Sequence, residues 1–420
     1  MRNLFHRSRL AAAGLAVLTV LIGGAILYQI PAINSRLTWR IEIAETYVRG
    51  LLNPVEPMPT ALPLARLTLA TMTPTVPVVT PGLLAETPEP TPSPTPTPTL
   101  APLPEKVILN PPAHEVQDIN NCGPATLAMY LRWFGWEGDQ HTISDLVKPV
   151  RQDRNVNVEE LLWYTRTRAG WLQSEFRVGG TVELLKRLLA LQMPVMIEEG
   201  FIMEESYWPN DDRWSGHYLL LTGYDDSRQV FIGQDSFVGP DRVISYQDLD
   251  NQWKAFNRVY FLLFPPERQV EVQAVLGPDW DVDENRQRAL EAAQREAQEN
   301  PEDALAWFNV GTNLVYFEKY SQAAQAYDQA RNLGLPQRML RYQFGPFFAY
   351  FHTGRNEDLL SLTEYALMRT PNSEEALLWN GWALYRAGKK QEAIENFNLA
   401  LEVRADYSDA IYALNYVLQN

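Results

Sequence analysis

Residues 54–104 constrain the fold of this chain most, because a segment of this kind cannot join a packed core. Its second half reads TPEPTPSPTPTPTLAPLP, a low-complexity Pro/Thr sequence with too little apolar content to fold. Alternating prolines favour polyproline II at roughly 3.1 Å per residue, so residues 81–104 alone would reach on the order of 70 Å. We expect residues 31–104 to form a short helix over 31–53 and then a disordered stalk.

An uncharged, mostly apolar run precedes this segment, at residues 10–30. As a helix these residues span about 30 Å, close to the hydrocarbon thickness of a bilayer. Arg2, Arg7 and Arg9 lie before the run without any acid, which favours a cytoplasmic N-terminus. We therefore expect residues 1–30 to be a single-pass membrane anchor, with the bulk of the chain extracytoplasmic. A cleaved signal peptide, followed by secretion, is the alternative.

Composition excludes some classes of partner and site. The formal net charge of −15 disfavours nucleic acid, because an acidic chain repels phosphate backbones. A single cysteine excludes an intrachain disulfide and metal sites built on several thiolates. We expect neither a metal nor a cofactor.

Residues 105–266 have the pattern of one α+β domain. Apolar periodicity predicts helices first, over 122–134, 141–148, 157–169 and 181–191. Strand signals follow, over 194–198, 217–224, 229–234, 242–246 and 258–264, with a hairpin turn at 225–228.

The only cysteine, Cys122, lies at the start of the first of these helices. Asn120 and Asn121 are good N-cap residues, and Pro124 is tolerated in a first helical turn. The helix dipole and free N–H groups favour an anion there, so the pKa of a thiol at this position can fall below about 8.5. The alternative is a small buried residue that happens to begin a helix.

A reactive thiol needs a base and a group that orients it. His217 begins the strand HYLLLTGYD, and a hairpin turning at 225–228 places it opposite residue 236. Asp235 or Ser236 should therefore lie beside the imidazole. His114, eight residues before Cys122, is a less well placed alternative base.

Gln117 completes the candidate site. Its amide can donate to an oxyanion together with the backbone N–H of Cys122. The order Gln117, Cys122, His217, Asp235 is that of papain-like enzymes.

Residues 284–420 are helical, with a repeat of about 34 residues. Gly311 and Gly381 are each followed by Ala, an aromatic residue and Ala at the same spacing. Small residues at these places let the two helices of a hairpin approach closely. The pattern resembles the tetratricopeptide repeat, with a middle unit that fits less well and a capping helix at 408–418.

Residues 105–266 resemble the peptidase family typified by the double-glycine leader peptidases of bacteriocin exporters, in its stand-alone C39-like branch. The matching pieces are Q-x4-CGP-A-x-LAM-x-L, then GHYLLLTGYDD, then an aspartate on the next strand. The resemblance implies a papain-like fold with Cys122 as nucleophile, His217 as base, Asp235 as orienter and Gln117 as oxyanion donor. One departure is Asp235-Ser236, where many relatives have Asp-Pro.

The sequence thus predicts a papain-like cysteine peptidase domain followed by an all-α tetratricopeptide-repeat solenoid. The substrate would be a peptide or protein, and the repeats would bind a protein partner or the substrate. The alternative is a catalytically inactive papain-like domain in a cell-surface scaffold whose repeats do the binding.

The acidic, aromatic segment at residues 198–214 directly precedes His217 and allows two interpretations. It is either a long exposed loop or a lid that faces the substrate and favours basic or sugar-linked peptides. Trp208 and Trp214 would belong to such a lid.

Overall fold

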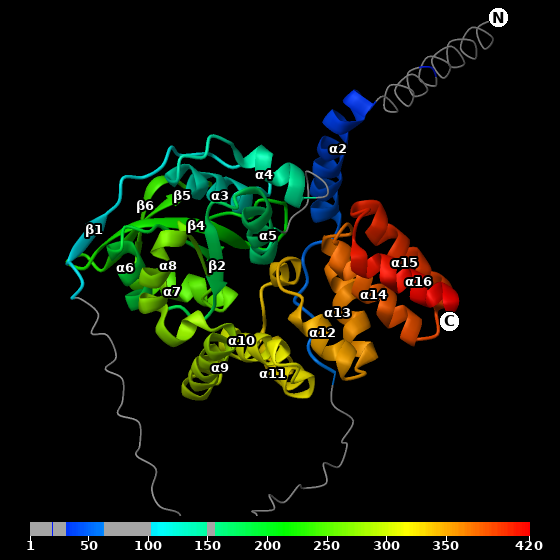
Figure 1. Cartoon of the computed structure of the whole chain (residues 1–420). Helices are drawn as coiled ribbons and strands as arrows, with labels where there is room; N and C mark the ends of the chain where they lie inside the picture. Colours follow the sequence, from blue (N-terminus) through cyan, green and yellow to red (C-terminus); the bar gives the residue numbers. More distant parts are fainter. Residues whose placement is uncertain (1–18, 20–30, 63–101, 149–155) are drawn as a thin grey trace, which may run out of the picture.

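The computed structural model describes residues 19, 31–62, 102–148 and 156–420. Within them, the centre of the first folded unit is an antiparallel seven-stranded sheet in the order β2-β7-β3-β4-β5-β6, with β1 beside β4 (Figure 1). The strands are β1 (Lys106–Ile108), β2 (Gln173–Arg177), β3 (Val195–Ile202), β4 (Trp214–Asp225), β5 (Val230–Asp235), β6 (Gly239–Ser245) and β7 (Tyr260–Phe264).

Helices cover both faces of this sheet because its central strands are apolar on both faces. Met196 and Leu220 pack in one cluster with the helices on the α3 side, whereas Val195, Ile197 and Leu219 pack in the other with α6, α7 and α8. The helices are α3 (Cys122–Trp133), α4 (Gln140–Val147), α5 (Val158–Arg168), α6 (Val182–Ala190), α7 (Tyr246–Trp253) and α8 (Gln269–Leu276).

The elements expected in this unit are confirmed, with differences at their ends. All four expected helices and all five expected strands are present. The sequence did not predict β1, β2 or α7, which are short or start in polar sequence. The helix α7 forms because the Ser245 side chain caps it by accepting from the Asp248 N–H at 3.0 Å.

The second unit is helical and follows the sheet directly. Each helix packs chiefly on its neighbours in sequence (Figure 1). Its helices are α9 (Val282–Glu299), α10 (Ala304–Tyr316), α11 (Tyr320–Leu333), α12 (Gly345–His352), α13 (Asn356–Arg369), α14 (Glu374–Arg386), α15 (Lys390–Val403) and α16 (Ser408–Gln419). Short 3₁₀ turns are η1 (Lys254–Phe256), η2 (Pro266–Arg268), η3 (Gly277–Trp280) and η4 (Gln337–Arg341).

The close helix pairs expected at Gly311 and Gly381 are confirmed. A Cβ at Gly311 would lie 2.7 Å from the Tyr327 ring, and one at Gly381 would lie 2.5 Å from the Phe397 ring. Glycine is therefore required for these helices to approach so closely. The identity of the repeats as tetratricopeptide repeats stays a prediction.

Helix α2 and the residues that follow it lie beside the last helices of the chain (Figure 1). Helix α2 (Pro31–Leu52) confirms the helix expected at 31–53, and residues 53–62 continue from it as an extended N-terminal strap against α11 and α13. The hydrogen bonds that hold the strap include Arg331 Nε to the Pro59 carbonyl at 3.0 Å, Arg331 Nη2 to the Thr60 carbonyl at 3.1 Å, and the Tyr365 hydroxyl to the Glu56 carbonyl at 2.6 Å.

The expectation that the disordered stalk begins at residue 54 is therefore wrong for residues 54–62. Proline lacks an N–H donor but keeps its carbonyl, so a proline-rich segment can still be bound by arginine and tyrosine donors. Of the stalk, residues 63–101 lie outside the described residues.

The expected membrane anchor, residues 10–30, lies outside the described residues except for Thr19. Among the helices of the described ranges, none combines the length and apolar character needed to cross a bilayer.

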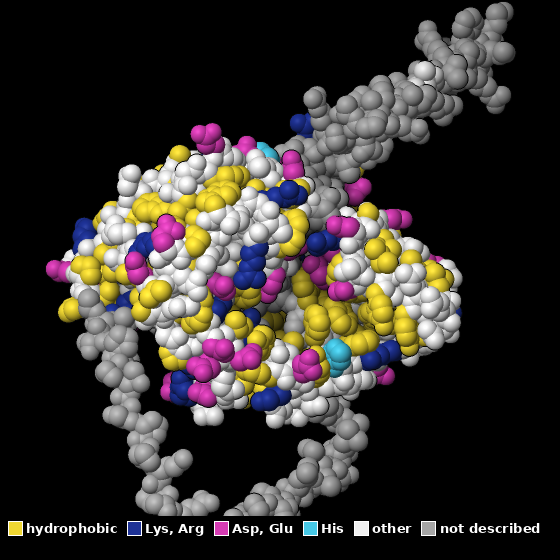
Figure 2. Space-filling view, viewed as in Figure 1, with side chains coloured by type: hydrophobic (Ala, Val, Ile, Leu, Met, Phe, Trp, Pro, Cys, Tyr) yellow, Lys and Arg dark blue, Asp and Glu magenta, His cyan; other side chains and the backbone are white. Residues whose placement is uncertain are grey.

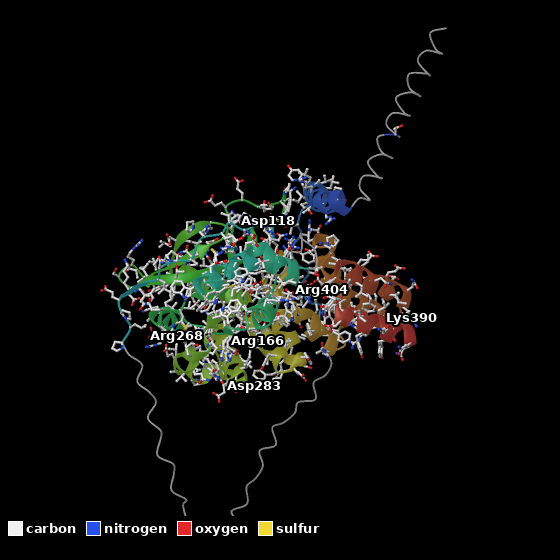
Figure 3. The ribbon with its side chains drawn as sticks, turned by 45° about the horizontal axis from the view of Figure 1, so that its top comes forward. Asp118, Arg166, Arg268, Asp283, Lys390 and Arg404 are labelled. Atoms are coloured by element: carbon white, nitrogen blue, oxygen red, sulfur yellow. The ribbon has the colours of Figure 1, made fainter. Side chains whose placement is uncertain are left out.

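The two units meet across a hollow, which Figure 2 shows with hydrophobic side chains on the helical side. Polar contacts bridge the two sides. Arg404 lies between the units (Figure 3), and its Nη1 is 3.0 Å from Glu160 Oε1 on α5. Arg338 of η4 pairs with Asp211 at 2.6 Å. The helical unit therefore contributes to the surface around the sheet.

Candidate active site

Cys122 is the first residue of α3, and its side chain is partly exposed. The rest of the helix is anchored in the core, where Leu127 and Leu131 are fully buried. Thr126 on the next turn donates to the Tyr218 carbonyl of β4 at 3.2 Å. The sulfur is thereby held at the helix tip, directly against β4.

His217 lies on β4 and is almost completely buried. Its Nε2 is 2.8 Å from Asp235 Oδ1, and its side chain is also hydrogen-bonded to Cys122. Because Nε2 faces Asp235, the other ring nitrogen, Nδ1, is left for the sulfur. The edges of the rings of Phe201 and Phe237 flank the imidazole at centroid distances of 5.4 and 6.5 Å.

Asp235 ends β5 and is fully buried. Its Oδ1 accepts from the backbone N–H groups of Phe237 and Val238 at 2.8 Å each, in addition to His217. Its Oδ2 is 2.9 Å from Arg242 Nη1. Burial opposes ionisation, but the bond and charge of His217 outweigh it and hold the pKa of this carboxyl well below its usual range.

These contacts set the charges of the sulfur and the imidazole. Burial raises the pKa of the Cys122 thiol, but the hydrogen bond and charge of His217 outweigh burial and lower the pKa below 9.0. Burial lowers the pKa of His217, but Asp235 and Cys122 outweigh it and raise the pKa to about 10. Both shifts favour a thiolate beside an imidazolium, which is the nucleophilic form of cysteine.

Gln117 lies beside this pair, next to Ser236. Its N–H donates to the Ser236 carbonyl at 2.9 Å, and its Oε1 accepts from the Ser236 hydroxyl at 2.9 Å. With Oε1 bonded in this way, the Nε2 group of Gln117 is left as the donor of the amide. Ser236, the departure from the family pattern, therefore fixes the orientation of Gln117.

His114 makes a different contact. Its Nε2 is 2.8 Å from the backbone carbonyl of Asp235, behind the carboxylate. The structure thus brings together Cys122, His217, Asp235 and Gln117 and places His114 at the back of this group.

Arg242 and Glu199 complete the group, and the sequence analysis did not find them. Arg242 Nη1 bonds both Asp235 and the buried Glu199, and its Nη2 bonds Gln252 at 3.1 Å. Strand pairing places Glu199 opposite His217 and Arg242 opposite Gly233. Extending the strand register to β3 and β6 would have predicted the positions of both residues.

The pair Cys122–His217 opens into a cleft of about 370 Å³. The lining comes from both units and from α2: Ile43, Gln117, Asp118, Glu198, Phe201, Tyr207, Trp208, Phe237, Arg338, Arg341 and Tyr342 are among its residues. Asp118, on the loop before α3, lies on the side of the sheet unit that faces α2 (Figure 3). No local sequence signal predicts the contributions of α2 and η4, because they arise from contacts between distant parts of the chain.

Residues 198–214 were expected to form one long loop or lid, but the loop in the structure is shorter. Residues 198–202 belong to β3, and Ile202 pairs with Trp214 at the end of the hairpin. Trp214 is buried against Phe256 and Tyr342, so its place in a lid is wrong. Trp208 does line the cleft.

The described residues contain no cluster of three or more His, Cys, Asp or Glu side chains that could hold a metal ion.

Similar structures have been solved for each unit. A C39-like peptidase from Bacillus anthracis is 16% identical, with 38% of this chain and 98% of that chain covered and a TM-score of 0.30. Xylellain, a cysteine protease from Xylella fastidiosa, is 16% identical over 39% of this chain and 87% of its own, with a TM-score of 0.30. YrrB, a TPR protein with an unusual peptide-binding site, is 20% identical over 32% of this chain and 68% of its own, with a TM-score of 0.29.

None of the curated proteins matches the chain. One family model does match, and it covers the segment that carries Cys122, His217, Asp235 and Gln117. Residues 108–261 of this chain are similar to the Peptidase_C39 like family.

Proposed function

We propose that this protein is a cysteine peptidase that cleaves a peptide or protein substrate through Cys122, His217 and Asp235. The observation that carries the proposal is the line of hydrogen bonds from Asp235 through His217 to the sulfur of Cys122, at the edge of a cleft. Burial of a charged pair of this kind costs desolvation free energy, and such pairs are typical of functional sites.

The reaction follows from the charges. The Cys122 thiolate attacks the carbonyl carbon of the scissile amide, while the Gln117 amide and the Cys122 N–H bind the oxyanion. The His217 imidazolium gives its proton to the leaving amine, the C–N bond breaks and a thioester remains. Neutral His217 then takes a proton from water, whose oxygen attacks the thioester and releases the acid and the thiolate.

We also propose that the enzyme is anchored in a membrane and works outside the cytoplasm. The apolar run at residues 10–30 behind Arg2, Arg7 and Arg9 supports a membrane anchor with the peptidase outside the cytoplasm. The 34-residue spacing supports tetratricopeptide repeats, which would bind a protein partner or the substrate.

The test of the proposal is the reaction of the full chain with iodoacetamide between pH 4 and 11. Since Cys122 is the only thiol, the rate reports its ionisation directly. We expect the rate to rise through an apparent pKa below 9.0, because His217 stabilises the thiolate. A rate that rises only above pH 9 would leave a structural thiol, and the inactive scaffold would then be the better interpretation.

Arg242 should act as a positioning residue in this reaction. Arg242→Gln removes the cation that bonds Asp235 and Glu199, so kcat should fall roughly 10- to 100-fold while KM is retained. Peptide hydrolysis measures both, and Arg242→Lys should restore part of kcat. Arg228→Gln, on the exposed turn of the neighbouring hairpin, is the matched control. A change in KM as large as the change in kcat, with no recovery in Arg242→Lys, would contradict a positioning role.

A further inference from the structure

Glu198 is an acid in the cleft that the proposed reaction does not use. It lies on β3, where it pairs with Tyr218 of β4, the neighbour of His217. Its side chain lines the cleft with Cys122, although only 7% of the residue is exposed. Glu198 is therefore positioned to meet a group of the substrate close to the reacting sulfur.

The surroundings of Glu198 act on its carboxyl in opposite directions. Burial, together with the charges of Cys122 and Glu159, raises the pKa of Glu198, whereas the hydrogen bond with Tyr218 lowers it. Burial outweighs the bond, so the pKa of Glu198 lies well above its usual value.

Other buried acids of this region have a cationic partner, unlike Glu198. Glu199 pairs with Arg242, and Asp211 pairs with Arg338. Among the described residues, the charges that act most strongly on Glu198 are those of Cys122 and Glu159, which are both negative. A buried acid without a cationic partner in a cleft is a candidate for a binding group, because an incoming cation can supply the opposite charge.

We propose that Glu198 selects substrates that carry a basic side chain, lysine or arginine, beside the scissile bond. The proposal rests on the proposed function and gives its substrate class. When the basic side chain enters, Glu198 releases its proton to solvent and forms an ion pair with the ammonium or guanidinium group.

This arrangement also protects the thiolate. An ionised Glu198 without a partner would disfavour the negative sulfur of Cys122, since like charges repel at short range. A neutral Glu198 has no such effect, and an ion-paired one has its charge compensated by the substrate. The cleft arginines Arg338 and Arg341 both interact with Asp211.

The test compares two pools of quenched peptides that differ only in lysine or norleucine at each position in turn. For the wild-type chain we expect kcat/KM to favour lysine on the order of 100-fold at one position. Glu198→Gln should abolish this preference and leave the norleucine rate within a few-fold, because glutamine keeps the size of the side chain and an oxygen that accepts from Tyr218. Glu159→Gln, an equal change of charge on an exposed residue, should keep the preference.

A second measurement separates this proposal from the proposed function. Calorimetry of the same peptides with the Cys122→Ala chain reports binding without any turnover. Tighter binding of the lysine pool, with a proton released to the buffer and both effects absent from the Cys122→Ala, Glu198→Gln double variant, supports the role of Glu198 even if no peptide is cleaved. Equal binding of the two pools, or a lysine preference that survives Glu198→Gln, overturns it.

Discussion

Replacement of Cys122 by alanine should lower peptide hydrolysis by about a million-fold, the loss that a serine protease shows when its nucleophile is removed. The physical reason is that no other thiol exists in the chain to form the thioester. The fold should survive, because Cys122 is partly exposed at a helix end and alanine is a good helix residue. Hydrolysis of a quenched peptide library measures the effect.

Unchanged circular dichroism and an unchanged urea midpoint are the controls for this variant. Alkylation by iodoacetamide should vanish altogether, which verifies that Cys122 was the labelled group. Turnover by the alanine variant at the wild-type rate would show that the reaction belongs to another site or to a contaminant.

Replacement of His217 by alanine should have the second largest effect. Without the imidazolium, burial is left to raise the pKa of the Cys122 thiol. An unperturbed thiol with a pKa of about 8.5 is only a few per cent ionised at pH 7, so alkylation at this pH should slow by roughly 10-fold or more. The measurement is the alkylation rate against pH, which should now rise only in the alkaline range.

The rate of peptide hydrolysis by the wild-type chain should fall on the alkaline side, whereas alkylation of the His217→Ala variant should rise there. The thiolate–imidazolium pair forms as pH rises through the lowered thiol pKa and is lost as His217 deprotonates at about pH 10. His114→Ala is the matched control, because His114 bonds the Asp235 carbonyl. If His114→Ala slowed alkylation and His217→Ala did not, the assignment of the base would be reversed.

Part of the candidate site could be predicted from local sequence patterns. Cys122 follows two candidate N-cap residues, of which Asn121 occupies the N-cap without a side-chain cap bond, and precedes an apolar-periodic run. His217 lies on a strand that a short turn joins to the strand of Asp235. These features depend on residues close in sequence, and the contact between His217 and Asp235 is present as expected.

Other parts of the site depend on pairing between distant segments. Glu198 and Glu199 read as part of an acidic loop, but β3 continues to Ile202 because it pairs with β4 along its whole length. The contributions of Ile43 and Arg338 require α2 and η4 to pack beside the sheet. Such contacts between segments are decided by the tertiary structure and override local sequence signals.

The N-terminal strap has a consequence for the order of events during biosynthesis. The strap leaves the ribosome early, whereas its partners Arg331 and Tyr365 are translated about three hundred residues later. Domains generally fold in the order of synthesis, so the sheet can form while the strap is still unattached. Fastening of the strap must therefore be a terminal step, which can occur only after translation has passed α13.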